Sequence, residues 1–321
     1  MNLDALRRRI DRRLSGLFAG KEPQSLYGPM AYALNAGGKR IRPVLVLLAC
    51  EAVGGKTTMA LDAAVAVELL HTFTLVHDDI MDHDPLRRGK PTVHVRWDES
   101  TGILVGDGLV TMASETLLRT AHPALHTVLQ VFTRGLRTVC EGQAMDKAFE
   151  SRSGVTLAEY KRMVERKTAA LLEMSCAIGA LLGDGTAREW NALRRFALRL
   201  GTAFQIQDDL LDIAAESDVL GKPIGSDIGG KKKTYLSIHF HEHASRRQQA
   251  VLASRWGKRR MTRSDIKAIR KVFEETGTLV SARAAVRSTI DRAVGALTPL
   301  EDSPAKEALC SLARSLGERT Y

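Results

Sequence analysis

The chain has 321 residues, of which 44% are hydrophobic and 26% are charged. This composition is typical of an ordinary globular protein and excludes a disordered or fibrous chain. The net charge of +10 predicts an anionic partner, which could be nucleic acid, a membrane surface or a phosphorylated small molecule. Because the basic runs lack the interleaved aromatic residues of a single-strand binding surface, we interpret most of them as solvated helix faces.

The cysteines and the apolar runs indicate a protein of the cell interior. Cys50, Cys140, Cys176 and Cys310 lie far apart without a C-x-x-C pair, which argues against a zinc site and a disulfide framework. The amino-terminal stretch MNLDALRRRIDRRL lacks the apolar run of a signal peptide. The longest apolar run, over residues 44–50, is far shorter than the roughly 20 residues of a membrane span. We therefore expect a cytoplasmic protein without a transmembrane segment.

Helical periodicity dominates the chain. Apolar residues recur at three- and four-residue spacing, for example over residues 61–82 and 161–183, and no stretch shows sustained two-residue alternation. Residues 61–82 are apolar around most of the helix circumference, which predicts a central helix buried by its neighbours. With no Ser/Pro-rich linker and no short repeat, the pattern predicts one all-α domain over residues 1–321.

The first candidate binding segment along the chain is the basic stretch NAGGKRIRPVL, residues 35–45. Its two glycines would let the backbone approach a ligand closely. Lys39, Arg40 and Arg42 follow directly, at the start of an apolar helix, where backbone N–H groups favour an anion. The segment therefore predicts a site for a negatively charged group.

An acidic cluster ends the helix over residues 61–82, in the stretch LVHDDIMDHDPLRRG. Asp78 and Asp82 share one helix face, and Asp79 lies about 100° around from Asp78. Like charges at this spacing destabilise a helix by a few tenths of a kcal/mol, and by more when they are partly desolvated. We therefore expect a positive partner beside them, and Arg87 and Arg88 follow within a few residues.

A second acidic cluster, in FQIQDDLLD, repeats the spacing with Asp208, Asp209 and Asp212. One D-D-x-x-D motif alone is more often a surface acidic turn, but two on apolar helices indicate a common design. Carboxylate oxygens suit magnesium, which keeps some of its waters and bridges to phosphates. The two motifs therefore predict opposite walls of a magnesium-diphosphate site.

Further cations stand near these motifs. Lys167 enters an apolar helix in ERKTAALL, and Lys222 and the lysines at 231–233 follow the second motif in GKPIGSDIGGKKKTY. A single lysine is usually solvated, but cations beside both acidic motifs indicate that two anions are held. One would be held through metal and the other directly.

In this order, GGKRIRP, HDDIMD with LRRGKPTVH, KTAALLE, FQIQDDLLD and GKPIGSDIGGKKKTY resemble the trans-isoprenyl diphosphate synthases, the farnesyl and geranylgeranyl diphosphate synthase family. The resemblance covers about residues 25–240. It implies an all-α helical bundle of the isoprenoid synthase type with a central active-site cavity, forming a single polyprenyl synthetase domain. It also implies a homodimer and three Mg²⁺ ions that hold an allylic diphosphate between the acidic motifs.

The resemblance also assigns roles to individual residues. Asp78 and Asp82 would bind magnesium directly, and Asp208 would be the leading ligand of the second motif. Asp79 and Asp212 would contact metal-bound water or support the direct ligands. The whole predicted metal site comprises Asp78, Asp79, Asp82, Asp208, Asp209 and Asp212. The predicted substrate-binding residues are Lys39, Arg42, His71 and Arg88 for isopentenyl diphosphate, and Arg87, Lys167, Lys222 and Lys232 for the allylic diphosphate. Thr168 and Gln205 would join Lys167 as catalytic residues that line the developing cation.

These roles fit one reaction. Magnesium and the cations stabilise the negative charge of the departing diphosphate, and an allylic carbocation remains. The double bond of isopentenyl diphosphate attacks that cation, and a proton is then lost. His71 lies about two turns before Asp78 on the same face, so its motif context favours a ligand contact over a purely structural role. His77 is interpreted as structural.

Product length should depend on the helix turn before the first motif. Thr74 shares the face of Asp78 and is small, whereas Phe73 is bulky but rotated by about 100°. In the resembled family this arrangement is similar to the archaeal geranylgeranyl diphosphate synthases. We therefore expect elongation of C5 to C15 allylic diphosphates to a C20 product, with a C15 or mixed C15/C20 product as the alternative.

Other interpretations remain open. A class I terpene cyclase also carries a D-D-x-x-D motif, but GGKRIR would give a second diphosphate site that a cyclase does not need. A non-catalytic partner subunit would usually lack an aspartate or arginine that is present here, and nucleic-acid binding ranks third. One departure from the family is Lys231, which replaces the usual glycine and could displace Lys232 as the phosphate contact.

Overall fold

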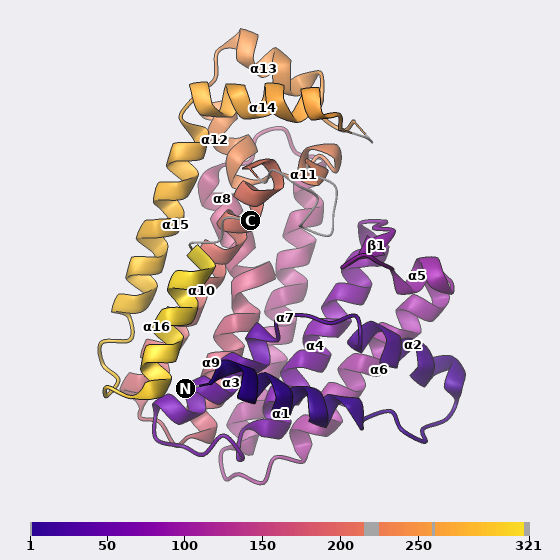
Figure 1. Cartoon of the computed structure of the whole chain (residues 1–321), viewed down its shortest axis with the longest axis vertical. Helices are drawn as coiled ribbons and strands as arrows, with labels where there is room; N and C mark the ends of the chain where they lie inside the picture. The colour runs from indigo at the N-terminus through magenta and orange to yellow at the C-terminus, as the bar shows by residue number, and fades with distance from the viewer. Residues whose placement is uncertain (1, 215–224, 259–260, 318–321) are drawn as a thin grey trace. The chain divides into compact units, whose positions relative to one another are not determined.

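The computed structural model describes residues 2–214, 225–258 and 261–317, and the structural statements below concern this part of the chain (Figure 1). The chain divides into two compact units. Unit 1 comprises Met1–Leu136, Leu171–Arg195 and Ala296–Cys310, and unit 2 comprises Arg137–Ala170, Phe196–Gly295 and Ser311–Tyr321. That residues 1–321 form a single domain stays a prediction.

Unit 1 is built mainly from the first helices of the chain. Between its fourth and fifth helices it carries an antiparallel hairpin with Leu86 opposite Pro91 and Arg87 opposite Lys90. Its elements are α1 (Leu3–Ser15), α2 (Gln24–Leu34), α3 (Ile41–Ala52), α4 (Leu61–Met81), β1 (Leu86–Arg87), β2 (Lys90–Pro91), α5 (Val93–Arg96), α6 (Glu99–Leu118), and parts of α7 (Leu125–Glu150), α9 (Ala170–Leu182), α10 (Ala187–Ala214) and α16 (Pro304–Gly317).

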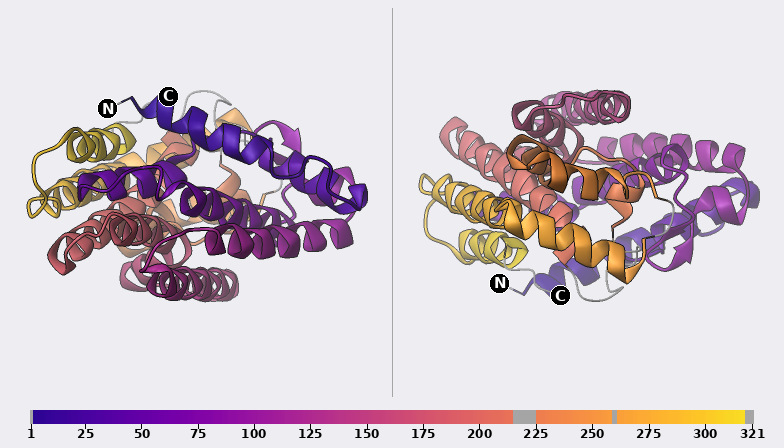
Figure 2. Two further views of the ribbon diagram at one scale, coloured as in Figure 1. Left: turned by 90° about the horizontal axis from the view of Figure 1, so that it is seen from below. Right: turned by 90° about the horizontal axis from the view of Figure 1, so that it is seen from above.

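Unit 2 contains the remaining parts of α7, α10 and α16 and the later helices of the chain. Within it α12 packs on α15, α14 packs on α15, and α13 packs on α14 (Figure 2). Its other elements are α8 (Leu157–Val164), the π-helix η1 (Glu165–Ala169), α11 (Ser226–Gly229), α12 (Tyr235–His243), α13 (Arg246–Ala253), α14 (Arg263–Glu275) and α15 (Thr278–Gly295).

Helix α4 forms the centre of unit 1, because every residue from 63 to 72 is buried. Its partner α6 approaches closely because two glycines face it. A Cβ atom at Gly102 would lie 2.8 Å from the Ile80 side chain, and one at Gly106 would lie 2.0 Å from His77 Nε2. The prediction of a buried central helix is confirmed, and its close fit to α6 fixes the position of the first acidic motif.

The predicted all-α class is confirmed, since helices account for nearly all of the regular structure in the described residues. The hairpin was not predicted, because strands of two residues are too short to show an alternating pattern. None of the described helices combines the length and the apolar character that crossing a membrane requires.

Candidate active site

The first acidic motif occupies the end of α4. Asp79 is buried, whereas Asp78 and Asp82 are half-buried, and the Asp82 N–H donates to the Asp78 carbonyl at 2.8 Å in the last turn. Carbonyl dipoles make the C-terminal end of a helix negative, so three aspartates there add charge of the unfavourable sign. This end of α4 therefore favours a cation.

One such cation comes from the hairpin. The Arg87 guanidinium lies 2.6 Å from the Asp79 carboxylate and 3.6 Å from Asp84. Burial alone would lower the pKa of Arg87, but the hydrogen bond and charge of Asp79 raise it above its ordinary value. Arg87 and Asp79, eight residues apart, therefore form a charged pair that fixes the hairpin to α4.

The neighbouring Arg88 lies against the glycine-rich segment. Gly38 has φ +142°, and a Cβ atom there would lie 2.6 Å from Arg88 Nη1. The glycine is therefore needed for the approach of a guanidinium of this same chain, in addition to the ligand approach that the sequence predicted. Desolvation lowers the pKa of Arg88, the charge of Glu68 opposes this, and the positive charges of Arg40 and Arg87 lower the pKa further. An anion bound at this guanidinium would offset the repulsion from Arg40 and Arg87.

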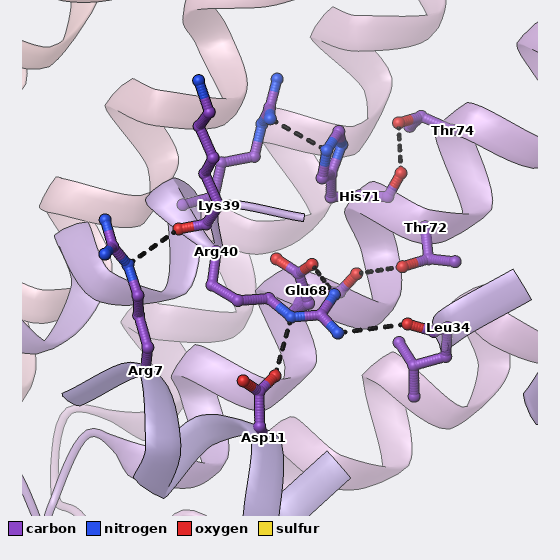
Figure 3. Close-up of polar contacts among 10 residues, drawn as sticks. Arg7, Asp11, Leu34, Lys39, Arg40, Glu68, His71, Thr72 and Thr74 are labelled. Carbon is purple, nitrogen blue, oxygen red and sulfur yellow. Dashed lines mark hydrogen bonds and ion pairs between the residues drawn. The ribbon is translucent and has the colours of Figure 1, made fainter. Parts of the chain in front are cut away.

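Arg40 belongs to the fold of unit 1 (Figure 3). It begins α3 at φ 48°, and its guanidinium lies 2.6 Å from Glu68, 2.9 Å from Asp11 and 3.2 Å from the Leu34 carbonyl. The side chain of Lys39 points away from this cluster. The three basic residues of the segment thus separate, with Arg40 neutralised in the interior.

Arg42 is directed to the predicted ligand His71. Arg42 Nη1 lies 2.9 Å from His71 Nε2, and because a guanidinium can only donate, Nε2 must be the acceptor. The proton of the neutral ring is then on Nδ1, which has no hydrogen-bond partner among the described residues. Burial, and then the charges of Arg42 and Arg88, lower the pKa of His71 well below its ordinary value. His71 is therefore a neutral ring that orients Arg42.

A small hollow lies beside these groups within unit 1. It is lined by the end of α2, by α4 and by the hairpin, and its polar lining includes Glu68, Thr72, Asp79, Arg87 and Arg88. Arg87 and Arg88 line this hollow and also belong to the predicted diphosphate site. His71 and Asp78 do not line it, because they lie on a neighbouring face of α4.

The predicted product-length residues lie one turn before the motif. Phe73 is half-buried, and its ring packs edge-on against His77 with centroids 4.8 Å apart. Thr74 is also half-buried, and its hydroxyl donates to the His71 carbonyl at 2.8 Å. His77 in turn lies against Gly106 of α6, so it has the structural role that was predicted for it.

In unit 2 the second acidic motif occupies the last turns of α10, again at the negative end of a helix. Asp209 is buried and accepts from Gln205 Nε2 at 3.0 Å, from the Tyr160 hydroxyl at 2.6 Å and from the Tyr235 N–H at 3.0 Å. The Gln205 side chain also accepts from the Thr168 hydroxyl at 2.9 Å. The two predicted catalytic residues Thr168 and Gln205 therefore form one network with the motif.

Asp212 is also buried and turns toward α11. Its carboxylate accepts from the Ser226 N–H at 3.1 Å, the Ser226 hydroxyl at 2.9 Å and the Asp227 N–H at 3.2 Å. Burial, and next the charge of Asp227, raise the pKa of both Asp209 and Asp212. Asp208 is half-buried, so it is the more exposed member of this motif.

Lys167 stands in η1. Its ammonium lies 2.5 Å from the Asp146 carboxylate of α7, and a Cβ atom at Gly142 would lie 2.2 Å from the Lys167 backbone nitrogen. Short π-helical turns inside α-helices occur frequently at functional sites. Sequence reasoning missed Asp146, for which the only signal is its place four residues after Gly142, on the same face of α7.

Tyr160 was missed as well. Its ring is 2% exposed, and a buried tyrosine hydroxyl usually needs a hydrogen-bond partner, which would have been the signal. It is fixed by the capping box that begins α8, in which Thr156 and Glu159 bond each other's backbone N–H groups at 3.0 and 3.2 Å.

The lysine-rich segment separates into different environments. Lys231 has φ 58°, and its side chain lies over Gly257, where a Cβ atom would be 2.3 Å from Lys231 Cε. Lys232 is half-buried, and the Lys233 ammonium lies 5.1 Å from the ring centre of Trp256. The predicted ligand Lys222 lies outside the described residues.

In the described ranges, no group of three His, Cys, Asp or Glu side chains gathers as it would around a metal ion. The described residues do provide two helix ends rich in carboxylates, one with Arg87 on Asp79 and the other with the Arg270 guanidinium 2.9 Å from the Ile213 carbonyl. An all-α chain with paired D-D-x-x-D motifs of this kind belongs to the class of prenyltransferases.

The chain belongs to the polyprenyl synthetase family, whose model matches residues 23–273. It is 38% identical to the geranylgeranyl diphosphate synthase of Methanosarcina mazei over 97% of this chain and 95% of that protein. The predicted family, fold class and prenyltransferase activity are therefore confirmed.

Solved structures agree with this assignment. The geranylgeranyl pyrophosphate synthetase of Pyrococcus horikoshii Ot3 matches with a TM-score of 0.94 and 39% identity, covering 99% of this chain and 97% of that one. A polyprenyl synthase of Caulobacter crescentus CB15, complexed with calcium and isoprenyl diphosphate, matches with a TM-score of 0.89 and 28% identity, covering 99% and 98%.

Proposed function

We propose that the protein is a geranylgeranyl diphosphate synthase that condenses isopentenyl diphosphate with C5 to C15 allylic diphosphates. The observation that carries the proposal is that each D-D-x-x-D motif ends a helix with an arginine held there: Arg87 on Asp79 in unit 1, and Arg270 on the carbonyl of Ile213, next to Asp212, in unit 2. The similarity to geranylgeranyl diphosphate synthases supports the product class. The alternative product is farnesyl diphosphate or a C15/C20 mixture.

The residues at the two helix ends fit a divalent metal. Asp78, Asp82 and Asp208 are half-buried carboxylates at negative helix termini, where a cation is favoured. We assign direct metal contacts to these three and expect three Mg²⁺ ions with the substrate bound. Calcium and isoprenyl diphosphate in the Caulobacter crescentus relative support a divalent ion beside a diphosphate. Bound magnesium would supply positive charge against the diphosphate as it leaves.

Isopentenyl diphosphate would be held by Lys39, Arg42, His71 and Arg88. The direct contact of Arg42 with His71, and that of Arg88 with Gly38, support this group as one site. Arg88 is well placed as an anion ligand, because its guanidinium lies against Gly38 and lines the hollow beside α4, and no described carboxylate forms an ion pair with it.

The allylic diphosphate would be held by Arg87, Lys167, Lys232 and Lys222. Arg87 is paired with Asp79 and Lys167 with Asp146. Each of these carboxylates holds its cation in position, and a bound diphosphate would take over part of the interaction with that cation. The cation site would be lined by the Thr168 hydroxyl and by Gln205, which are already joined at 2.9 Å.

The reaction needs no protein nucleophile. The bond between the allylic carbon and its diphosphate oxygen breaks, and the electron pair leaves with the diphosphate. The π electrons of isopentenyl diphosphate then form the new carbon–carbon bond, and a proton passes to the departed diphosphate. Arginine and lysine side chains preorganised at the phosphate positions stabilise the charge that develops there.

Product length would be set by Phe73 and Thr74. Changing Phe73→Ala removes the ring that packs on His77 and should therefore shift the product beyond C20. The products can be sized by chromatography after removal of the diphosphate. His77→Ala, which removes the support of the ring, should shift length in the same direction but less. An unchanged product profile in Phe73→Ala would refute this assignment.

We also propose that residues 1–321 act as one catalytic domain with a central cavity, that two copies form a homodimer, and that the protein is cytoplasmic. Sedimentation and the distribution of a tagged protein test the last two statements.

The function is tested by incubating the purified protein with Mg²⁺, isopentenyl diphosphate and each of the C5, C10 and C15 allylic diphosphates. We expect a C20 product from all three primers. A C15 end product from C5 and C10, without use of C15, would favour the farnesyl alternative. No elongation with any primer would refute the proposal.

A further inference from the structure

Two buried aspartates of the second motif bind backbone N–H groups on either side of the lysine cluster. Asp212 accepts from Ser226 and Asp227 through its side chain, and its own carbonyl accepts from the Gly225 N–H at 2.9 Å. Asp209 accepts from the Tyr235 N–H at 3.0 Å. Residues 225–235, which we call the lysine segment, are therefore fixed at both ends to α10, with Lys231, Lys232 and Lys233 between the two attachments.

These hydrogen bonds occupy most of the acceptor positions of the two carboxylates. A carboxylate offers about four lone-pair positions, two on each oxygen. Asp209 receives three donors, one on Oδ1 from Gln205 and two on Oδ2 from Tyr160 and Tyr235. Asp212 likewise receives three, two on Oδ1 and one on Oδ2. Both residues are less than 10% exposed.

Both attachments are supported by local structure. Thr234 and Ser237 form a capping box that begins α12, which holds the Tyr235 N–H at the helix start. The Tyr160 hydroxyl reaches Asp209 from α8 at 2.6 Å and fixes the direction of its carboxylate. Removing one partner from a buried hydrogen-bonded network leaves the others poorly oriented.

We propose that Asp209 and Asp212 are positioning residues that hold the lysine segment on α10, and that Tyr160 orients Asp209 for this purpose. Their function is then to place the Lys232 ammonium for the allylic diphosphate, while Asp208 is left as the direct metal ligand of the motif. This inference rests on the proposed function for the identity of the anion that Lys232 meets. It assigns to Tyr160 a role that no motif indicated.

The matched pair of variants is Tyr160→Phe and Tyr235→Phe. The first removes the hydroxyl that donates to Asp209. The second removes a hydroxyl whose partner is Ser281 at 2.9 Å, and it keeps the backbone N–H that Asp209 accepts. The two rings lie 6.3 Å apart, so the two changes perturb the same neighbourhood. Ser226→Ala tests the other attachment, because it removes the hydroxyl bond to Asp212.

The first readout is hydrogen exchange of the amides of Ser226, Asp227 and Tyr235 in the metal-free, substrate-free protein. We expect faster exchange at Tyr235 in Tyr160→Phe and at Ser226 and Asp227 in Ser226→Ala, with no change in Tyr235→Phe. Exchange rates equal to those of the unchanged protein in both test variants would overturn the proposal. This readout does not depend on activity, so it is separate from the test of the proposed function.

The second readout is steady-state kinetics at saturating Mg²⁺ with the C10 allylic diphosphate. A positioning role predicts that Tyr160→Phe raises KM for the allylic substrate by about ten-fold, the size typical of lost supporting contacts. The KM for isopentenyl diphosphate and the Mg²⁺ concentration for half activity should stay unchanged. A raised Mg²⁺ requirement with an unchanged allylic KM would overturn the proposal, since it would make Asp209 a metal ligand.

Discussion

The two D-D-x-x-D motifs share one letter pattern but are fixed by different partners. In unit 1 the middle aspartate, Asp79, is held by the charged side chain of Arg87. In unit 2 Asp209 and Asp212 are held by uncharged donors, namely a tyrosine hydroxyl, an amide and backbone N–H groups. A repeated motif therefore does not imply a repeated environment, because residues far away in the sequence supply the partners.

This difference has a consequence for charge. An arginine cancels the charge of the carboxylate it contacts, whereas neutral donors only distribute it. The buried pair Asp209 and Asp212 accordingly has a raised pKa, while the cation next to Asp79 has its own pKa raised by that carboxylate. In the first motif Asp79 is thus neutralised by an ion pair, whereas Asp209 and Asp212 of the second motif are stabilised by uncharged hydrogen-bond donors.

The largest expected effect is a loss of kcat on substitution of the half-buried aspartates Asp78 and Asp208. Asp78→Asn and Asp208→Asn should each lower kcat by about a thousand-fold, because a few kcal/mol of charge stabilisation at the diphosphate is lost. Asp84→Asn is the control, since the Asp84 carboxylate lies 3.6 Å from Arg87 and outside the motif, so kcat should stay within a few-fold. Product formation from labelled isopentenyl diphosphate measures all three, and retained activity in Asp208→Asn would remove the second motif from the metal site.

The next effect concerns the glycine segment of unit 1. Gly38→Ala places a methyl group 2.6 Å from Arg88 Nη1 and should raise KM for isopentenyl diphosphate by about ten-fold, by displacing a charged hydrogen-bond donor. Gly37→Ala is the control, because Gly37 also has a positive φ of +87° but no atom within 4 Å of an added Cβ. Equal losses in both variants would point to backbone strain instead of Arg88.

The two regions should respond to pH with opposite signs in the metal-free protein. The pKa of His71 is lowered, so the unfolded chain takes up a proton first and stability falls as pH drops below 6.5. The pKa values of Asp209 and Asp212 are raised, so the folded chain keeps protons that the unfolded chain has lost, and stability falls as pH rises above 3.8. Each slope is at most about 1.4 kcal/mol per pH unit and proton.

Urea unfolding across this pH range measures both slopes. His71→Gln keeps an acceptor for Arg42 and should gain relative stability on acidification, whereas Asp212→Asn should gain it on alkalinisation. Variants with the same pH dependence as the unchanged protein would show that these groups do not carry the shifts.

The smallest effect concerns Lys231. A residue other than glycine in the left-handed region costs about 1–2 kcal/mol, and glycine loses about 0.5–1 kcal/mol through its greater freedom when unfolded. Lys231→Gly should therefore raise the free energy of unfolding by about 0.5–1 kcal/mol and leave the allylic KM unchanged. A raised KM would instead identify Lys231 as the phosphate contact in place of Lys232.

The sequence predicted what depends on spacing within one element. Asp78 and Asp82 on one face of α4, the buried centre of that helix and the all-α class all follow from local periodicity. The resemblance expects a glycine at the position of Lys231. The structure gives Lys231 a φ of 58°, a conformation that favours glycine.

What the sequence did not predict are contacts between distant elements. Arg40 stands between two predicted ligands but pairs with Glu68, 28 residues away. Asp146 and Tyr160 act through Lys167 and Asp209, 21 and 49 residues away. Such partners are chosen by tertiary packing, for which one sequence gives only the general rule that buried polar groups need partners.

The central proposal is that both motifs bind one allylic diphosphate through metal, while Asp209 and Asp212 hold the lysine segment on α10. The most direct measurement is a crystal structure with Mn²⁺ and an unreactive allylic diphosphate analogue, in which anomalous scattering locates the metal ions. We expect the ions on one diphosphate to contact Asp78, Asp82 and Asp208, with Asp209 and Asp212 still bonded to residues 226, 227 and 235. Metal bound at the first motif alone, or bound directly by Asp209 or Asp212, would contradict this account.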